Sequence, residues 1–312
     1  MRGTLRMNSD GRLITRGLTK VYSGSGSRRA IDQITMDMPT HGILAFIGRN
    51  GAGKTTLVRI LATQLEPTSG SATIDGLDVM LDARELRKRI AIVPQEARTV
   101  AWMSPKQTVL SYLMWRGFDY SEAKEMAVEA LARVGIDQYR DKLNRTLSGG
   151  TKRKVLVATV LASEADIVFL DEPTTGLDPI SRRDLWNYLS NLGRERFTIL
   201  TTHYLEEAEQ LADRISILDR GRLVGTGTLE ELRSLVKYRY SIRLQQETQL
   251  LVTANGELAK ARDGSVQLLT TEDEAFRLSK DLFEKGYRFS ISPVTLDDIF
   301  FHLANREDEP QP

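Results

Sequence analysis

The sequence predicts an α/β fold in which helices cover a mostly parallel sheet. A helical subdomain lies in the middle of the chain, and a small α+β appendage lies at its C-terminal end. Two observations support this prediction. Up to about residue 227, short apolar runs alternate with segments of helical periodicity, as in parallel sheets covered on both faces. Near Thr228 a capping box with Glu231 then begins a second, separate series of strands and helices.

The size and composition of the chain fit an ordinary globular protein of about two domains. Its 312 residues are 41% hydrophobic and 27% charged, which excludes collagen-like, disordered and disulfide-rich classes. The 43 basic and 42 acidic residues leave no bulk charge that favours nucleic acid or an anionic membrane. Cysteine is absent, so disulfides, thiolate metal sites and thiol catalysis are excluded.

The sequence shows neither a secretory signal nor a membrane span. The first 17 residues contain no apolar segment of the kind that a secretory signal requires. The longest apolar stretch, 155–162, is far shorter than the roughly 20 residues needed to cross a bilayer. We therefore expect that this chain does not span a membrane by itself.

In the first part of the chain, strand and helix patterns alternate. Strands are expected at 12–21, 31–38, 43–47, 71–74, 90–93, 167–170, 197–201 and 215–218. Helices are expected at 55–65 and at 180–192, the latter ended by Gly193. The helical subdomain spans about 96–165, and within it Ser121 is the expected N-cap and Gly135 the expected C′ residue of one helix. These elements make up an expected domain of residues 12–227.

The C-terminal part has its own strand and helix patterns. Strands are expected at 238–244, 265–269 and 287–292, and helices at 271–285 and 296–303. Together they form an expected α+β accessory domain of residues 228–305. Residues 1–11 are expected to be a disordered N-terminus, and residues 306–312 a charged tail.

Residues 48–55, GRNGAGKT, fit the phosphate-binding pattern G-x-x-x-x-G-K-[ST]. The segment lies between an apolar strand and a predicted helix, which is the context that the motif requires. Its glycines let backbone N–H groups surround a polyphosphate, Lys54 reaches the β and γ phosphates, and the Thr55 hydroxyl ligates Mg²⁺. A chance match in a chain of this length is on the order of one in a hundred. The motif therefore predicts a P-loop nucleotide-binding site.

A second motif supplies two carboxylates. The apolar strand 167–170 ends at Asp171 and Glu172. The C-terminal ends of parallel strands lie at the ligand crevice of such sheets, so both side chains are expected beside the nucleotide. There Asp171 can hold Mg²⁺ through water, and Glu172 can act as a general base next to the γ-phosphate.

With these motifs the chain resembles the nucleotide-binding subunits of ATP-binding-cassette (ABC) transporters. Leu147-Ser148-Gly149-Gly150 is similar to the family's signature sequence, and Ser148 stands 23 residues before Asp171, as in the family layout. Gln95 matches the Q-loop, residues 176–178 match the D-loop, and His203 matches the switch histidine. Tyr22 matches the aromatic residue that stacks on adenine. The resemblance covers residues 12 to about 227, and seven motifs follow one another in the family's order.

The resemblance implies a role for each matching residue. The residues expected to bind ATP are Tyr22, Gly48, Asn50, Gly51, Ala52, Gly53, Lys54, Thr55, Thr56, Ser148, Gly149, Gly150 and Asp178. The residues expected to hold Mg²⁺ are Thr55, Gln95 and Asp171. The residues expected to take part in catalysis are Glu172, His203, Gln95 and Lys54.

The resemblance also implies a second nucleotide-binding chain. In the family, Ser148 and Gly150 would point across a head-to-tail dimer interface at the γ-phosphate bound by the other subunit. Thr151 stands where the family usually has glutamine, and Arg49 where it often has proline. Neither change removes a phosphate or metal contact. All catalytic positions are present, so a homodimer with two competent sites is expected, with a heterodimer as the alternative.

The implied partner is a separate multi-span membrane permease, which would hold the chain at the cytoplasmic face of the membrane. The run 293–303 is similar to the tail of bacterial drug and antibiotic exporter ATPases of the daunorubicin-resistance kind, which favours export. A plain packing role for this helix is the alternative. The other functions weighed are a cassette ATPase that acts on the ribosome or nucleic acid, and a P-loop kinase or GTPase. The single cassette and the lack of a basic excess argue against the former, and the signature argues against the latter.

Two further expectations concern the helical subdomain. The basic triplet Lys152, Arg153 and Lys154 is expected to lie on a solvated helix face. Apolar residues after Gln95 are expected either to dock on the membrane subunit or to fill the subdomain's own core. They are Val100, Trp102, Met103, Leu110, Leu113, Met114 and Trp115.

Overall fold

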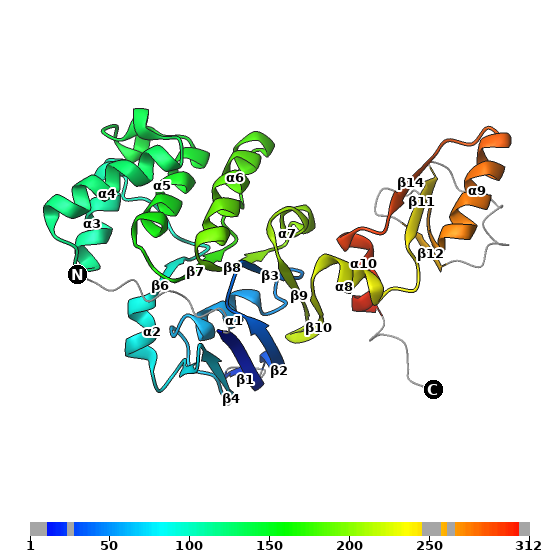
Figure 1. Cartoon of the computed structure of the whole chain (residues 1–312), viewed down its shortest axis with the longest axis horizontal. Helices are drawn as coiled ribbons and strands as arrows, with labels where there is room; N and C mark the ends of the chain where they lie inside the picture. The colour runs from blue at the N-terminus through cyan, green and yellow to red at the C-terminus, as the bar shows by residue number, and fades with distance from the viewer. Residues whose placement is uncertain (1–10, 24–27, 245–256, 261–265, 306–312) are drawn as a thin grey trace. The chain divides into compact units, whose positions relative to one another are not determined.

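A computed structural model of the chain describes residues 11–23, 28–244, 257–260 and 266–305 (Figure 1). The chain divides into two compact units, Met1–Val224 and Gly225–Pro312. Apart from Gly11, whose carbonyl accepts a hydrogen bond from the Thr40 amide, the expected disordered segment 1–11 lies outside the described residues. The expected tail 306–312 also lies outside them.

The first unit is built on a six-stranded sheet. Its strand order is β10 (Arg222–Gly227), β9 (Arg214–Asp219), β3 (Ile43–Ile47), β8 (Phe197–Thr202), β7 (Ile167–Asp171) and β6 (Ile90–Val93). The strands from β9 to β6 pair in parallel. In β7, Val168 and Leu170 pack into the core beneath the helices α5 and α6, whereas Ile167 and Phe169 pack into the core that contains α1. Both faces are covered, so the strand is apolar throughout, as predicted.

A second, antiparallel sheet packs against the α1 side of this core. Its strand order is β2 (Arg28–Pro39), β1 (Arg12–Tyr22), β4 (Ser69–Ile74) and β5 (Leu77–Asp78). The sequence patterns identified β1, β2 and β4 but missed β5 and the helix α2 (Ala83–Arg89). Both are short, and α2 buries only Leu86, so neither has a readable apolar period.

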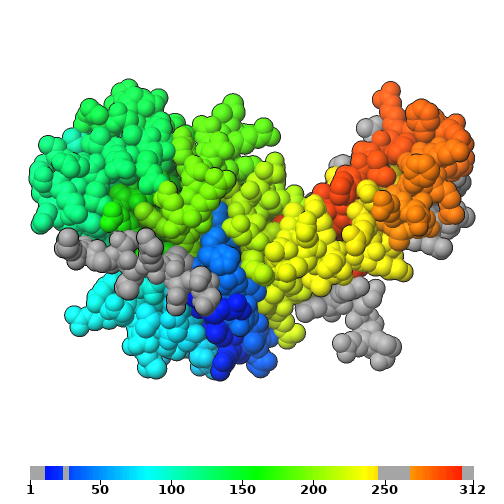
Figure 2. Space-filling model, viewed as in Figure 1, coloured from blue at the N-terminus to red at the C-terminus, as the bar shows by residue number. Residues whose placement is uncertain are grey.

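The predicted helical subdomain contains α3 (Pro105–Trp115), α4 (Tyr120–Arg133), α5 (Gly149–Ala162) and two short 3₁₀ turns, η1 (Asp137–Tyr139) and η2 (Asn144–Thr146). In the space-filling view these elements form one green lobe (Figure 2). Gly135 follows α4 with a φ of 68°, which confirms it as the C′ residue. The expected N-cap, Ser121, is wrong: the helix begins at Tyr120, and Asp119 takes the N-cap position.

The remaining helices of the first unit are α1 (Lys54–Leu61), α6 (Pro179–Glu195) and α7 (Leu205–Leu211). The predicted end of α6 at Gly193 is wrong, because the helix continues past it. A Cβ at this position would overlap the Ile43 side chain of the central sheet, so Gly193 allows a close helix-to-sheet contact instead of ending the helix. Helix α1 is shorter than predicted, since Thr63 already adopts a positive φ of 61°.

The second unit is a four-stranded antiparallel sheet with helices. Its strand order is β12 (Glu257–Lys260), β13 (Val266–Thr270), β11 (Tyr240–Leu244) and β14 (Phe289–Pro293). Helix α9 (Glu272–Glu284) buries Ala275 and Leu282 in the core of this sheet. The helices α8 (Leu229–Ser234) and α10 (Leu296–Asn305) pack on each other, and the predicted capping box of Thr228 and Glu231 is present. Within the described ranges, no helix combines the length and the apolar character that a membrane crossing needs.

Candidate functional site

The phosphate-binding motif forms the loop between β3 and the start of α1 at Lys54. Gly53 has a φ of 106°, and a Cβ there would overlap the carbonyl oxygen of Ala30. Only glycine fits both constraints. The first N–H groups of α1 have no partners within the helix, so they can donate to an anion at this end.

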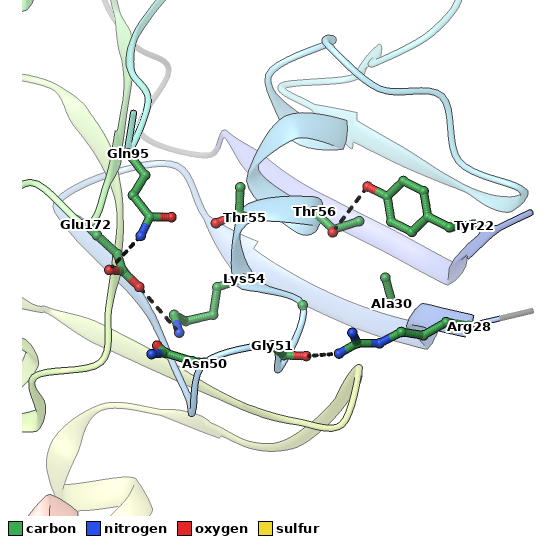
Figure 3. Close-up of a pocket in the computed structure, with 11 residues that line it drawn as sticks. Tyr22, Arg28, Ala30, Asn50, Gly51, Lys54, Thr55, Thr56, Gln95 and Glu172 are labelled. Atoms are coloured by element: carbon green, nitrogen blue, oxygen red, sulfur yellow. Dashed lines mark hydrogen bonds and ion pairs between the residues drawn. The ribbon is translucent and has the colours of Figure 1, made fainter. Parts of the chain in front are cut away.

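A pocket of about 310 Å³ opens over this loop (Figure 3). Its lining residues are Tyr22, Arg28, Ala30, Asn50, Gly51, Gly53, Lys54, Thr55, Thr56, Gln95 and Glu172. Nine of these were predicted from the sequence. Gly48 and Ala52 belong to the same loop, but they are buried and do not line the pocket.

Arg28 and Ala30 are the lining residues that the sequence did not predict. They lie at the start of β2, three residues earlier than the apolar pattern placed that strand. The guanidinium of Arg28 donates to the carbonyl oxygen of Gly51 at 3.3 Å, so it lies beside the phosphate loop. Its position directly after residues 24–27 carries no motif by which it could have been found.

Lys54 and Glu172 form the buried centre of the pocket. The side chains are 5% and 6% exposed, and Lys54 Nζ lies 3.7 Å from Glu172 Oε1. Lys54 also donates to the carbonyl oxygens of Gly48 and Arg49. Burial lowers the pKa of Lys54, while the negative charges of Glu172 and Asp171 oppose that shift. A bound polyphosphate would add negative charge at the same ammonium group.

Two more predicted residues converge on the Glu172 carboxylate. Gln95 Nε2 donates to Glu172 Oε2 at 3.1 Å. His203 Nδ1 lies 3.2 Å from the same oxygen but without the alignment of a hydrogen bond. The exposed residue Thr175 also donates its hydroxyl to this oxygen, at 3.0 Å. The carboxylate is therefore hydrogen-bonded by Gln95 and by Thr175 of its own turn, and Lys54 and His203 lie beside it.

Two of the three predicted metal ligands, Thr55 and Asp171, are hydrogen-bonded to each other. Thr55 Oγ1 donates to Asp171 Oδ1 at 3.2 Å, and the Thr201 hydroxyl bonds the same oxygen. Among the described residues, no cluster of three or more histidine, cysteine or acidic side chains is arranged to hold a metal. This donor set suits Mg²⁺, which is usually held by one or two protein oxygens together with substrate phosphates and water. Gln95 lines the same pocket.

Tyr22 lies at the other end of the pocket. Its side chain is 42% exposed, and its hydroxyl lies 3.5 Å from Thr56 Oγ1. Lys20 Nζ lies 5.7 Å from the centre of the ring. The exposed ring is available for stacking on an adenine base.

The remaining predicted residues form a separate surface of the first unit. Ser148 is the N-cap of α5, and its hydroxyl accepts a hydrogen bond from the Thr151 amide. Asp178 is the N-cap of α6 and accepts hydrogen bonds from the amides of Ile180 and Ser181. The bonds from Ser181 hold the pKa of Asp178 below its ordinary value. A Cβ on Gly150 would contact Ser181, so the signature and the D-loop are neighbours. None of these residues lines the pocket.

The expected solvated face at residues 152–154 is wrong for its central residue. The Arg153 side chain is only 8% exposed, because it points into the interior and donates to the backbone carbonyls of residues 171–173. Lys154 is partly buried and pairs with the exposed Asp184 at 3.2 Å. A basic triplet gives no sign in the sequence of which of its members turns inward.

The apolar residues after Gln95 divide into buried and exposed ones. Leu113 is fully buried in the core of the subdomain, whereas Trp102 and Trp115 are 77% and 80% exposed. Val100 and Met114 are also exposed. The loop that carries Trp102 is hydrogen-bonded to Asn144, in the segment before the signature. The Asn144 side chain donates to the Val100 carbonyl oxygen, and the Asn144 backbone N–H donates to the Met103 carbonyl oxygen.

Comparisons with known proteins show the family and the fold of the chain. The profile of the family described as ABC transporter matches residues 31–175. The daunorubicin/doxorubicin resistance ATP-binding protein of Streptomyces peucetius is 34% identical over 93% of this chain and 91% of its own length. A dimeric post-hydrolysis ATP-binding cassette bound to ADP and Pi shares the fold, with a TM-score of 0.64 and 23% identity over 70% of this chain and 98% of that one.

A protein from Clostridium perfringens that is part of an ABC transporter complex aligns with a TM-score of 0.62 and 29% identity, over 71% of this chain and 90% of its own. The P-loop NTPase fold predicted from the sequence is confirmed. The protein is thus an ATPase that uses ATP with Mg²⁺, and it belongs to the ABC transporter family as an ATP-binding subunit.

Proposed function

We propose that this chain is the motor of a membrane exporter. It would bind MgATP at the interface of a head-to-tail dimer and drive export through a separate multi-span permease, at the cytoplasmic face of the membrane. The related Streptomyces peucetius protein is named for resistance to daunorubicin and doxorubicin, which supports export over uptake. The proposed second subunit is another copy of this chain, supported by the dimeric state of the structural neighbour.

In the proposed mechanism, charge and position are supplied by a few residues of one chain. Lys54 neutralises charge on the phosphates, and the N–H groups at the start of α1 bind them. Glu172 takes a proton from the attacking water as the water oxygen bonds to the γ-phosphorus. The bond from this phosphorus to the bridging oxygen breaks, which leaves ADP and inorganic phosphate. Gln95 and His203, which both lie at Glu172 Oε2, orient this carboxylate and the water. Thr55, Asp171 and Gln95 would hold Mg²⁺, which would supply further charge neutralisation when bound.

The exposure of the loop around Trp102 is the observation that supports the proposed contact with a permease. An indole that is 77% exposed is costly to leave in water and is typical of interface anchors. This loop is bonded through Asn144 to the segment that ends at the signature. A push on the loop by a membrane subunit would therefore reach Ser148 through a short, hydrogen-bonded path.

Photocrosslinking tests this proposal. A photoreactive amino acid placed at Trp102 should capture a co-expressed membrane subunit. The same amino acid at Phe283, an aromatic residue of α9 with 79% exposure, is the matched control and should not capture it to a comparable extent. If the photoreactive group at Trp102 captures only ribosomal, nucleic-acid or other non-membrane partners, the exporter hypothesis is contradicted. A cassette ATPase of another kind is then favoured.

A further inference from the structure

Three consecutive backbone carbonyls beside the active site point at one buried guanidinium. Arg153 Nε donates to the Pro173 oxygen at 2.6 Å, and its Nη2 donates to the oxygens of Glu172 at 2.8 Å and Asp171 at 3.2 Å. Along a β-strand, successive carbonyls point to opposite sides of the chain. The convergence of these three on one side chain, at the end of β7, therefore requires a backbone conformation other than that of a strand.

That conformation occurs at Glu172. Its φ is 48°, in the left-handed region that residues other than glycine rarely adopt. Such backbone outliers persist only where the surroundings hold them in place. On one side, the Glu172 amide donates to the backbone and side-chain oxygens of Thr201. On the other side, the carbonyls of the same turn are held by Arg153.

A guanidinium suits this task because its donors form a rigid planar fork that can bond several oxygens at once. Its positive charge strengthens each of these bonds, and it lies close to the carboxylates of Asp171 and Glu172. Burial by itself lowers the pKa of Arg153, and the negative charges of Asp171, Glu172 and Glu207 oppose that shift. Two of these three acids are the residues whose backbone carbonyls Arg153 bonds.

We infer that Arg153 is a positioning residue for hydrolysis, which holds the turn at Glu172 and so aims the Glu172 carboxylate into the pocket. This inference rests on the proposed role of Glu172 as the base. Arg153 itself does not line the pocket, and it reaches the site through the backbone carbonyls of Asp171, Glu172 and Pro173. Its contribution is to the rate of the chemical step and not to nucleotide affinity.

The chain offers a matched control at the other end of the same helix. Arg196 is also partly buried, and it donates to the carbonyl oxygens of Val160 and Leu161 in the last turn of α5. Burial lowers its pKa as well. Arg196 thus has the same chemistry as Arg153, but it lies far along α5 from the pocket. Removing either guanidinium takes a hydrogen-bond donor from backbone carbonyls, but only the removal of Arg153 should disturb Glu172.

The test compares Arg153→Met with Arg196→Met in the full-length ATPase. Both substitutions should lower Tm. Arg153→Met should also lower kcat about 10- to 100-fold, the size of effect expected when a reacting group is misplaced by about 1 Å. It should leave the Kd for MgATP, measured with a fluorescent analogue, within about twofold. Arg196→Met should keep kcat per folded molecule.

A conservative series guards against a variant that does not fold. We expect kcat to decrease in the order Arg153, Arg153→Lys, Arg153→Gln, at constant MgATP affinity, because lysine keeps the charge but loses the planar fork. A normal kcat in Arg153→Gln, or equal kcat losses in the Arg153 and Arg196 variants, would overturn the inference.

A double variant separates this inference from the role of Glu172. If Arg153 acts through Glu172, Arg153→Met should not lower further the residual single-turnover rate of Glu172→Gln. A further loss in that background would show that Arg153 acts elsewhere, for example through the signature at the start of its helix. If Glu172→Gln hydrolyses ATP normally, the proposed base is wrong; if only the Arg153 variants are normal, the inference alone fails.

Discussion

The phosphate pocket and the signature surface of the first unit differ in how far their polar side chains are buried and paired. At the phosphate pocket, Lys54, Asp171 and Glu172 are almost fully buried; Lys54 pairs with Glu172, and Asp171 accepts a hydrogen bond from Thr55. At the signature surface, Ser148 and Asp178 are exposed and bond only to the first turns of their own helices. In the pocket, opposite charges of one chain therefore contact each other, whereas Ser148 and Asp178 lie outside the lining of this pocket.

The largest expected effect is on the rate of hydrolysis and comes from a substitution in the pocket. Glu172→Gln removes the proposed base but keeps the size of the side chain and its ability to bond Gln95. Loss of a general base typically lowers the rate about 10²- to 10⁴-fold, so kcat should fall in that range while ATP still binds. ATP hydrolysis and binding of a fluorescent ATP analogue measure the two quantities. Glu195→Gln, at an exposed ion pair with Arg133, is the control and should keep full activity.

A second experiment asks whether the signature surface is completed by another chain. Dimers of Lys54→Ala and dimers of Ser148→Arg should both be inactive, because each defect then affects both sites. In a mixed dimer, one site combines the intact Lys54 of one chain with the intact Ser148 of the other. We expect this site to occlude ATP again, measured by nucleotide retention in purified, doubly tagged dimers. No recovery in a verified mixed dimer would mean that each chain builds its site alone.

The same contrast explains what could be predicted from the sequence. The pocket was predictable because its chemistry follows from residue type and spacing: the glycine loop with Lys54 and Thr55, and the paired acids after β7. The parallel strands were equally readable, since burial on both faces makes them apolar throughout.

The rest depended on tertiary contacts that leave no local pattern. Gly193 has the identity of a helix terminator, but its role is set by the Ile43 side chain, which lies about 150 positions away in the sequence. Arg153 has the same basic character as its neighbours, and only its hydrogen bonds to the turn at Glu172 distinguish it. Arg28 lies in the pocket because β2 begins earlier than its apolar residues do.

A smaller effect is expected at the open end of the pocket. Tyr22→Ala removes the exposed ring, and loss of an aromatic stacking partner costs roughly 1–3 kcal/mol by analogy with base stacking. ATP affinity should therefore fall about 5- to 150-fold, since 1.4 kcal/mol corresponds to a factor of ten. Tyr22→Phe keeps the ring and loses only the weak contact with Thr56, so its affinity should stay near that of the wild type. Equal losses in both variants, measured by calorimetry, would assign the effect to the hydroxyl.

The smallest expected effect is at Asp178, on the signature surface. Asp178→Ala removes the N-cap of α6 and should lower Tm by about 3 °C at pH 7, whereas Asp178→Asn, an equally good cap, should change it little. The folded-state pKa of Asp178 is depressed, so its contribution to stability is present above the unfolded-state pKa near 3.9 and is lost as the pH falls through the folded value. The Tm deficit of Asp178→Ala should therefore shrink below about pH 4.

Nucleotide affinity distinguishes this local role from a role in the pocket. Asp178 lies outside the pocket lining, so the affinity of the dilute, monomeric chain for ATP should be the same in wild type, Asp178→Asn and Asp178→Ala. A reduced affinity in the monomer would place Asp178 in electrostatic contact with its own chain's nucleotide. The contrast between a complete pocket and an incomplete signature surface would then be wrong, because both surfaces would serve one site within a single chain.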